Sequence, residues 1–142
     1  MAAYYILKSE PKTYSIDQLK KDRSTNWNNI RNYQARNFLR EMQVGDQALI
    51  YHSNDDKAVV GLARVIKAAY PDYDADSAND SNGDWSQVDI KYVAHAKNPV
   101  ALATFKTHPV LKHTLLVKQS RLSVIPLSKE EFQIVCKLAG FA

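Results

Sequence analysis

The sequence predicts one α+β domain in which a mixed β-sheet curls into a barrel with short helices around it. Two observations lead to this class: five or six strand-like segments, and short helical segments inserted between them. A third concerns organisation, because no repeat, low-complexity tract or linker interrupts the 142 residues. A chain of this length is sufficient for one self-supporting core, so residues 1–142 are treated as a single domain.

The N-terminal elements are marked by residue type and by helix capping. Aromatic and branched side chains over 4–7 predict a first strand, which Pro11 stops. Ser15 followed by Gln18 matches a capping box and predicts a short helix that ends near residues 21–22.

The middle of the chain combines one helical stripe with long extended segments. Apolar residues at i, i+3, i+4 and i+7 predict a helix: Ala35, Phe38, Leu39 and Met42. Strands are predicted over 47–53, 58–69 and 85–93, and Pro71 ends the second. Gly61 indicates a bulge or a close backbone approach within that strand.

The C-terminal part is predicted to hold two more helices and a closing strand. One helix is expected over 98–106 with Pro99 at its first position, and the strand over 121–126. Ser128 with Glu131 forms a second capping box, which begins a last helix that ends at a glycine.

Charge and apolar content limit the partners. The net charge is +4, yet the segment between Asp72 and Asp84 carries five aspartates and no Lys or Arg, which leaves 19 basic against 10 acidic residues elsewhere. A basic body suits a polyanionic partner, although charge alone also fits an ordinary solvated surface. No apolar run can span a bilayer, no leader precedes the first strand, and one cysteine excludes an internal disulfide. A cytoplasmic protein without a membrane partner is expected, or a nuclear one in a eukaryote.

Metal binding and nucleophilic catalysis find little support. The segment from Asp72 imitates a calcium loop, but Ser77 and Gly83 replace the required glycine and bidentate glutamate. The histidines lack paired ligand spacing, and Cys136 lies on the apolar stripe of the last helix. We therefore predict no metal and no cofactor. Glu10 is the best lone candidate for acid–base chemistry.

Residues 27–37 are the most distinctive stretch. They bring together one tryptophan, one tyrosine, two arginines and several carboxamides. A flat ring beside hydrogen-bonding amides suits a planar heterocycle, and nearby cations such as Lys8 and Arg36 can hold phosphate. A plain core role for Trp27 is equally compatible with composition.

Six ordered motifs resemble the EVE domain family of the PUA-like superfamily, over nearly the whole chain from about Tyr4 to Leu138. The motifs are Lys8-Ser9-Glu10-Pro11, Trp27 through Asn37, Met42 with Gly45-Asp46, Tyr51-His52-Ser53, Tyr70-Pro71-Asp72, and Arg121-Leu122-Ser123-Val124 with Pro126. The resemblance implies a PUA-like mixed β-barrel with peripheral helices, related to the YTH readers of methylated RNA. It also implies a pocket for a modified nucleobase, with modified cytosine in DNA as the leading ligand.

The resemblance further implies a set of ligand-binding residues. They are Trp27 as a pocket wall, Ser9 and Glu10 at the polar rim, Asn32 and Tyr33 against the ligand or its loop, Tyr51 and Ser53 on a strand floor, and Arg31 on phosphate or in a salt bridge that braces the loop. Two departures from the family pattern are Asn29, where glycine is usual, and Tyr5, where tryptophan is usual. Asparagine tolerates a left-handed backbone, but it leaves less space for a ligand.

Three hypotheses follow. The first is a non-catalytic reader that binds a modified base of DNA or RNA, flipped or single-stranded. The second is an enzyme or processing factor that acts on modified RNA or DNA with Glu10 as general base. The third is a small-molecule or protein-interaction module that kept the barrel.

Overall fold

A mixed six-stranded sheet forms the centre of the computed structural model, which describes residues 3–54, 57–72 and 85–141. The strands are β1 (Tyr4–Ser9), β2 (Ser24–Trp27), β3 (Gln47–His52), β4 (Ala58–Pro71), β5 (Ser86–Ala101) and β6 (Val124–Leu127). Their order across the sheet is β2-β5-β4-β3-β1-β6. β1 and β3 pair in parallel, and the other neighbours pair antiparallel.

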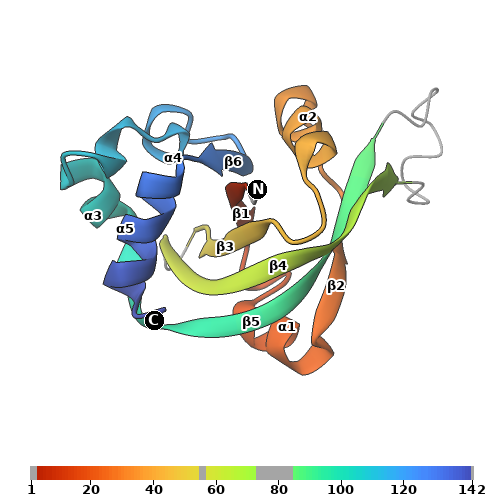
Figure 1. Cartoon of the computed structure of the whole chain (residues 1–142), viewed down its shortest axis with the longest axis horizontal. Helices are drawn as coiled ribbons and strands as arrows, with labels where there is room; N and C mark the ends of the chain where they lie inside the picture. The colour runs from red at the N-terminus through yellow and green to blue at the C-terminus, as the bar shows by residue number, and fades with distance from the viewer. Residues whose placement is uncertain (1–2, 55–56, 73–84, 142) are drawn as a thin grey trace.

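Short helices surround this sheet. In the described part of the chain they are α1 (Ile16–Asp22), α2 (Tyr33–Glu41), α3 (Leu102–Thr107), α4 (Leu115–Lys118) and α5 (Lys129–Ala139), with a 3-10 turn at Leu111–His113. The last three helices lie toward one end of the sheet and α2 lies toward the other (Figure 1).

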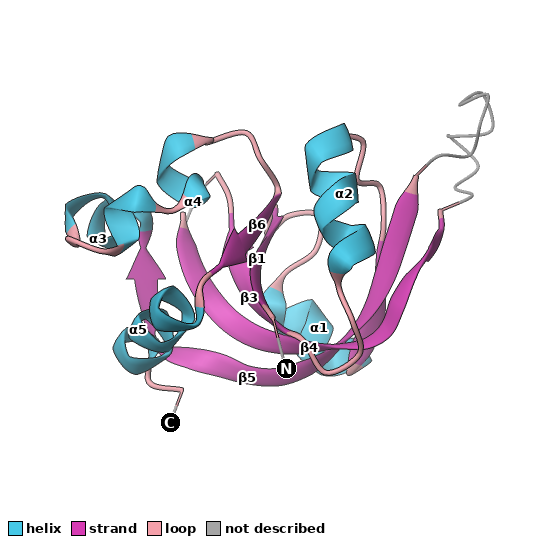
Figure 2. Ribbon diagram, turned by 45° about the horizontal axis from the view of Figure 1, so that its top comes forward, coloured by secondary structure: helices cyan, strands magenta, loops and turns pink. Residues whose placement is uncertain are grey.

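The sheet is strongly curled but open. β4 and β5 are the two longest strands and arc beneath the shorter ones (Figure 2). The edge strands β2 and β6 are not paired with each other among the described residues. The α+β class is therefore confirmed, whereas closure into a barrel is not.

Most of the predicted elements are confirmed at their starting residues. The Ser15 side chain accepts a hydrogen bond from the backbone N–H of Gln18, and Ser128 and Glu131 form the reciprocal capping box of α5. Gly140 ends α5 with a left-handed φ of +83°. Gly61 lies at a register shift in β4, as the bulge prediction requires.

The predicted helix over 98–106 is wrong in its first half. Strand β5 continues to Ala101, and α3 begins only at Leu102. Pro99 is tolerated because it lies in an irregular stretch: His95 pairs with Gly61 and Val100 with Val59, so residues 96–99 fall within a register shift.

One strand was missed altogether. β2 pairs antiparallel with β5, and Trp27 at its end lies opposite Val88. Its sequence, Ser-Thr-Asn-Trp, has no alternating apolar pattern that would indicate a strand. This pairing gives Trp27 a fixed place next to the exit of β1.

Candidate functional site

A cavity of about 580 Å³ opens where β1 ends and where the chain passes from β2 to α2. Its lining comes from three separate segments of sequence: Lys8, Ser9, Glu10, Thr13 and Tyr14; Thr25 through Asn32; and Ser123. The volume lies in the range of small-molecule sites in proteins, which is roughly 300–1,000 Å³.

Trp27 is both a wall of this cavity and part of the core. Its relative exposure is 7%, and it belongs to the main cluster of buried apolar residues. The ring of Tyr14 meets it edge-on, with centroids 6.1 Å apart and planes at 85°. The two readings of Trp27 left open by the sequence are therefore compatible with each other.

The polar rim is held in place by backbone contacts. The Ser9 hydroxyl donates to the Tyr14 carbonyl at 2.5 Å, which fixes the exit of β1 against the start of α1. The Oδ1 atom of Asn32 accepts from Ala35 N at 2.9 Å and caps α2. Because the cap uses only this oxygen, the amide nitrogen of Asn32 is left for another partner. Glu10 lines the same cavity and is exposed.

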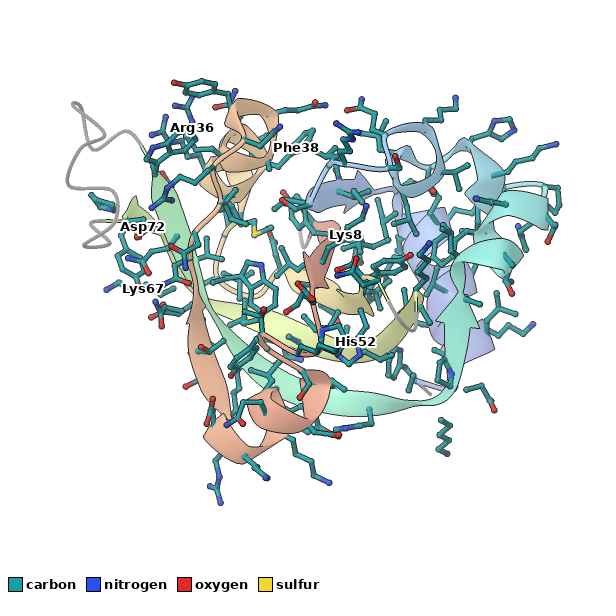
Figure 3. The ribbon with its side chains drawn as sticks, turned by 180° about the vertical axis from the view of Figure 1, so that it is seen from behind. Lys8, Arg36, Phe38, His52, Lys67 and Asp72 are labelled. Carbon is teal, nitrogen blue, oxygen red and sulfur yellow. The ribbon has the colours of Figure 1, made fainter. Side chains whose placement is uncertain are left out.

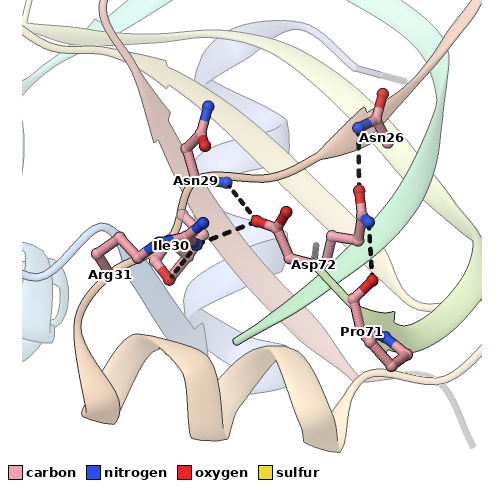
Figure 4. A network of polar contacts seen from close by, with 7 residues as sticks. Asn26, Asn29, Ile30, Arg31, Pro71 and Asp72 are labelled. Carbon is pink, nitrogen blue, oxygen red and sulfur yellow. Dashed lines mark hydrogen bonds and ion pairs between the residues drawn. The ribbon is translucent and has the colours of Figure 1, made fainter. Parts of the chain in front are cut away.

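A buried carboxylate supports the loop between β2 and α2. Oδ2 of Asp72 accepts from the backbone N of Asn29 at 2.9 Å and from Nη1 of Arg31 at 3.0 Å (Figure 4). Asn29 has a φ of +61°, so the turn uses the left-handed conformation that asparagine tolerates. Of the two roles predicted for Arg31, the structure shows the brace by a salt bridge.

The backbone next to Asp72 is hydrogen-bonded to the sheet. Gln87 accepts from the Asn26 amide at 2.9 Å and donates to the carbonyl of Pro71 at 3.0 Å (Figure 4). The end of β4, the start of β5 and the cavity loop are thereby joined in one network.

Two predicted residues lie outside the cavity, on the outer side of α2. Tyr33 is 64% exposed and stacks on Trp85, with centroids 5.0 Å apart and planes at 24°. The Arg36 guanidinium lies over Tyr33, 4.8 Å from the ring centroid. Figure 3 shows Arg36 well separated from Lys8. Tyr33, Trp85 and Arg36 form an aromatic stack in which Tyr33 is exposed, and none of the three lines the cavity.

Tyr51 and Ser53 line a different, smaller pocket of about 200 Å³. Lys8 lines both this pocket and the main cavity. Its ammonium group donates to the Ser120 carbonyl at 2.8 Å and lies 5.7 Å from the Tyr51 ring centroid. Burial lowers the pKa of Lys8 from its ordinary value. The structure thus places Ser9, Glu10, Trp27, Arg31 and Asn32 in one cavity lining. Tyr51 and Ser53, the predicted strand floor, line the neighbouring pocket instead.

Several lining residues were not predicted. Tyr14 directly precedes the Ser15 cap, and its proximity to Trp27 depends on long-range packing. Ser123 reaches the cavity because the backbone N of Lys8 donates to its carbonyl at 3.0 Å. Its place in the Arg121–Val124 motif was the only sequence signal for it.

The groups that could do chemistry are dispersed. Among the lining residues of the cavity, Glu10 is the only carboxylate, and neither histidine nor cysteine is present. Nε2 of His52 accepts from the backbone N of Ile16 at 3.0 Å, and burial raises the pKa of Cys136 to about 11. Within the described ranges, no cluster of three or more His, Cys, Asp or Glu could hold a metal ion. The calcium-like segment lies outside those ranges from residue 73 onward.

No helix in the described part of the chain is long and apolar enough to cross a membrane.

Comparison with known proteins identifies relatives that match nearly the whole of this chain. Residues 3–138 match the family model described as EVE domain. Human thymocyte nuclear protein 1 is 36% identical over 168 residues, which cover 97% of this chain and 74% of that protein. A hypothetical protein from Leishmania major superposes with a TM-score of 0.92 at 36% identity, covering 99% of this chain and 96% of that one. Human THYN1 protein in complex with 5-methylcytosine-containing DNA superposes with a TM-score of 0.85 at 38% identity, covering 97% and 98%.

Proposed function

Because this chain belongs to the EVE domain family, we propose that it is a non-catalytic reader that binds a modified cytosine of DNA in the cavity beside Trp27. The base enters the cavity extruded from a duplex or from a single strand. The observation that carries the proposal is one cavity that combines two aromatic rings with hydrogen-bonding groups at its rim.

The cavity offers what a pyrimidine ring requires. Trp27 and Tyr14 supply aromatic surface, and stacking on such surface contributes roughly 1–3 kcal/mol per base. This contribution is comparable to the few kcal/mol needed to extrude a base from a duplex. Further binding free energy must therefore come from hydrogen bonds at the rim.

The rim matches the edge of cytosine. The exocyclic amino group of cytosine is a donor that Asp or Glu accepts, and Glu10 is the carboxylate in the lining. The amide nitrogen of Asn32, which the helix cap does not use, is available to an acceptor of the base. Ile30, an apolar lining residue, is suited to contact a methyl substituent.

The relatives support the choice of ligand. The human THYN1 structure with 5-methylcytosine-containing DNA covers nearly the whole of this chain at 38% identity. Its ligand belongs to the same chemical class that the cavity here would accept. A modified RNA base is the related alternative, because the same ring and edge occur in both polymers.

Glu10→Ala tests the assignment, with Glu41→Ala as the matched control. Both substitutions remove one exposed carboxylate, but Glu41 lies at the end of α2 outside the cavity lining. We expect Glu10→Ala to weaken binding of a duplex containing one 5-methylcytosine by roughly tenfold, since a charged hydrogen bond is lost. Glu41→Ala should bind like the parent protein. Equal affinities for the two variants would contradict the role of Glu10.

The enzyme hypothesis predicts a chemical change in the bound nucleic acid. A general base needs a second group to complete acid–base work, and Glu10 is the sole carboxylate among the lining residues. Incubation of the protein with a modified oligonucleotide, followed by mass spectrometry of the oligonucleotide, distinguishes the reader from the enzyme. The reader leaves the mass unchanged, whereas an enzyme changes it.

A further inference from the structure

We propose that a basic groove beside the cavity binds the phosphate groups of the strand that carries the recognised base. The groove is lined by Asn32, Gln34, Lys118, Gln119, Ser120, Arg121 and Leu122, and its volume is about 310 Å³. This inference rests on the proposed function and adds to it the path of the nucleic-acid backbone.

The groove and the cavity are adjacent. Asn32 lines both of them, and Ser123 of the cavity follows directly on the groove residues in sequence. A nucleotide whose base fills the cavity must carry its phosphates at the cavity mouth, because the base is extruded by rotation about its own backbone. The groove adjoins the cavity at Asn32.

The cations of the groove are available to a ligand. Lys118 and Arg121 are exposed, and neither side chain has a hydrogen bond or ion pair with another described residue. The three cations predicted from the sequence are engaged: Lys8 on the Ser120 carbonyl, Arg31 on Asp72, and Arg36, outside the cavity, on the aromatic stack. Lys118 and Arg121 are therefore better candidates for phosphate contacts than the predicted Lys8 and Arg36.

The sequence that carries the groove residues 118–122 is basic. From residue 90 to residue 129 the chain carries seven Lys and Arg and no Asp or Glu. No carboxylate lines the groove itself. A groove lined by two cations and no carboxylate attracts a polyanion, and its affinity for that polyanion falls as salt is added.

The turn that presents these cations is firmly held. Lys8 donates to Ser120 through its ammonium group and to Ser123 through its backbone, at 2.8 and 3.0 Å. The side chain of Leu122 is buried, and its backbone N donates to the carbonyl of Gln119. Lys118 and Arg121 thus project from a backbone that is already ordered, which reduces the entropy cost of binding.

The test compares two double variants. Lys118→Gln with Arg121→Gln removes the groove cations, and Lys106→Gln with Lys112→Gln removes two exposed charges of the same basic segment outside the groove. The probes are a DNA duplex with one central 5-methylcytosine and the same duplex with cytosine, titrated at several salt concentrations. Equal melting temperatures of the two double variants verify that both are folded.

We expect the groove variant to lose roughly tenfold or more in affinity at low salt, while the control loses much less. The slope of log K against log salt should fall in magnitude by about 1.8, since each duplex phosphate contact contributes about 0.9. Both duplexes should lose affinity by the same factor, because phosphate contacts carry no sequence information.

Equal affinity and equal salt slopes for the two double variants would overturn the groove assignment and leave the base reader standing. The proposed function can also fail by itself. If the parent protein binds both duplexes equally and the groove variant still loses affinity, the base reader is contradicted and the phosphate-binding groove is supported. Absence of any binding by the parent would overturn both.

Discussion

The carboxylate of Asp72 lies 3.0 Å from the guanidinium of Arg31 and fixes the loop that forms one wall of the cavity. The same oxygen, Oδ2, accepts from the backbone N of Asn29 at 2.9 Å. Asp72 directly follows β4, so a residue 41 positions away from Arg31 determines the conformation next to Trp27.

Replacement of Asp72 should separate the two contacts. Asp72→Asn keeps an oxygen acceptor for Asn29 and loses the ion pair, whereas Asp72→Ala loses both. The side chain of Asp72 is only 3% exposed, so we expect the alanine variant to lower the free energy of unfolding by about 2 kcal/mol and the asparagine variant by about half of that. Urea denaturation measures both values. Identical stabilities of the two variants would show that the Asn29 contact contributes nothing.

Asn29 provides a test of the backbone itself. At a φ of +61°, Asn29→Ala should cost about 1 kcal/mol because a Cβ without a polar group is disfavoured in the left-handed region. Asn29→Gly places a residue without a Cβ at this position and should change stability by less than about 0.5 kcal/mol. The order of the melting temperatures, glycine above alanine, is the expected result, and the reverse order would contradict the strain argument.

The mode of entry of the base has its own test. Extrusion costs a few kcal/mol from a paired duplex and least from a mismatch. A duplex with 5-methylcytosine opposite a mismatched base should therefore bind more tightly than the fully paired duplex, by roughly tenfold. Equal affinity for the two duplexes would mean that the base is not extruded.

A pH dependence follows from the contact between His95 and Asp17. Nε2 of His95 lies 2.7 Å from Oδ1 of Asp17 and joins β5 to the first turn of α1. This hydrogen bond lowers the pKa of Asp17. A carboxyl whose pKa is lower in the folded state adds stability above its unfolded pKa, near about 4, and loses it as the pH falls through the folded value.

The parent should therefore lose stability more steeply than Asp17→Asn between about pH 5 and pH 2. The difference should be small, because the Asp17 side chain is 80% exposed. Parallel curves of stability against pH for parent and variant would contradict this assignment.

The capped helices and the long strands were predictable because their signals are local. Ser15, Ser128 and Gly140 act within one helical turn, and the apolar runs of β3 and β4 are read from neighbouring residues. The short strand β2 and the extension of β5 through Pro99 were not predictable. Both depend on a partner strand far away in sequence.

The site residues also fall into those that the sequence indicated and those that it did not. The resemblance of their motifs to the EVE domain family implied Ser9, Glu10, Trp27 and Asn32 as site residues, and the fold brings them into one lining. Tyr51 belongs to another of these motifs but lines a separate pocket. Lys8 lines both spaces, and its ammonium group lies over the Tyr51 ring. Tyr14 was missed because nothing in the sequence indicates its approach to Trp27.

The most direct measurement is the affinity of the parent protein for two duplexes that differ only in the 5-methyl group of one cytosine. A methyl group that enters a fitted apolar site is worth about 1–3 kcal/mol, so we expect the methylated duplex to bind roughly tenfold more tightly or better. The same affinity for both duplexes, across the full salt range, would contradict the proposal that this cavity reads a modified base.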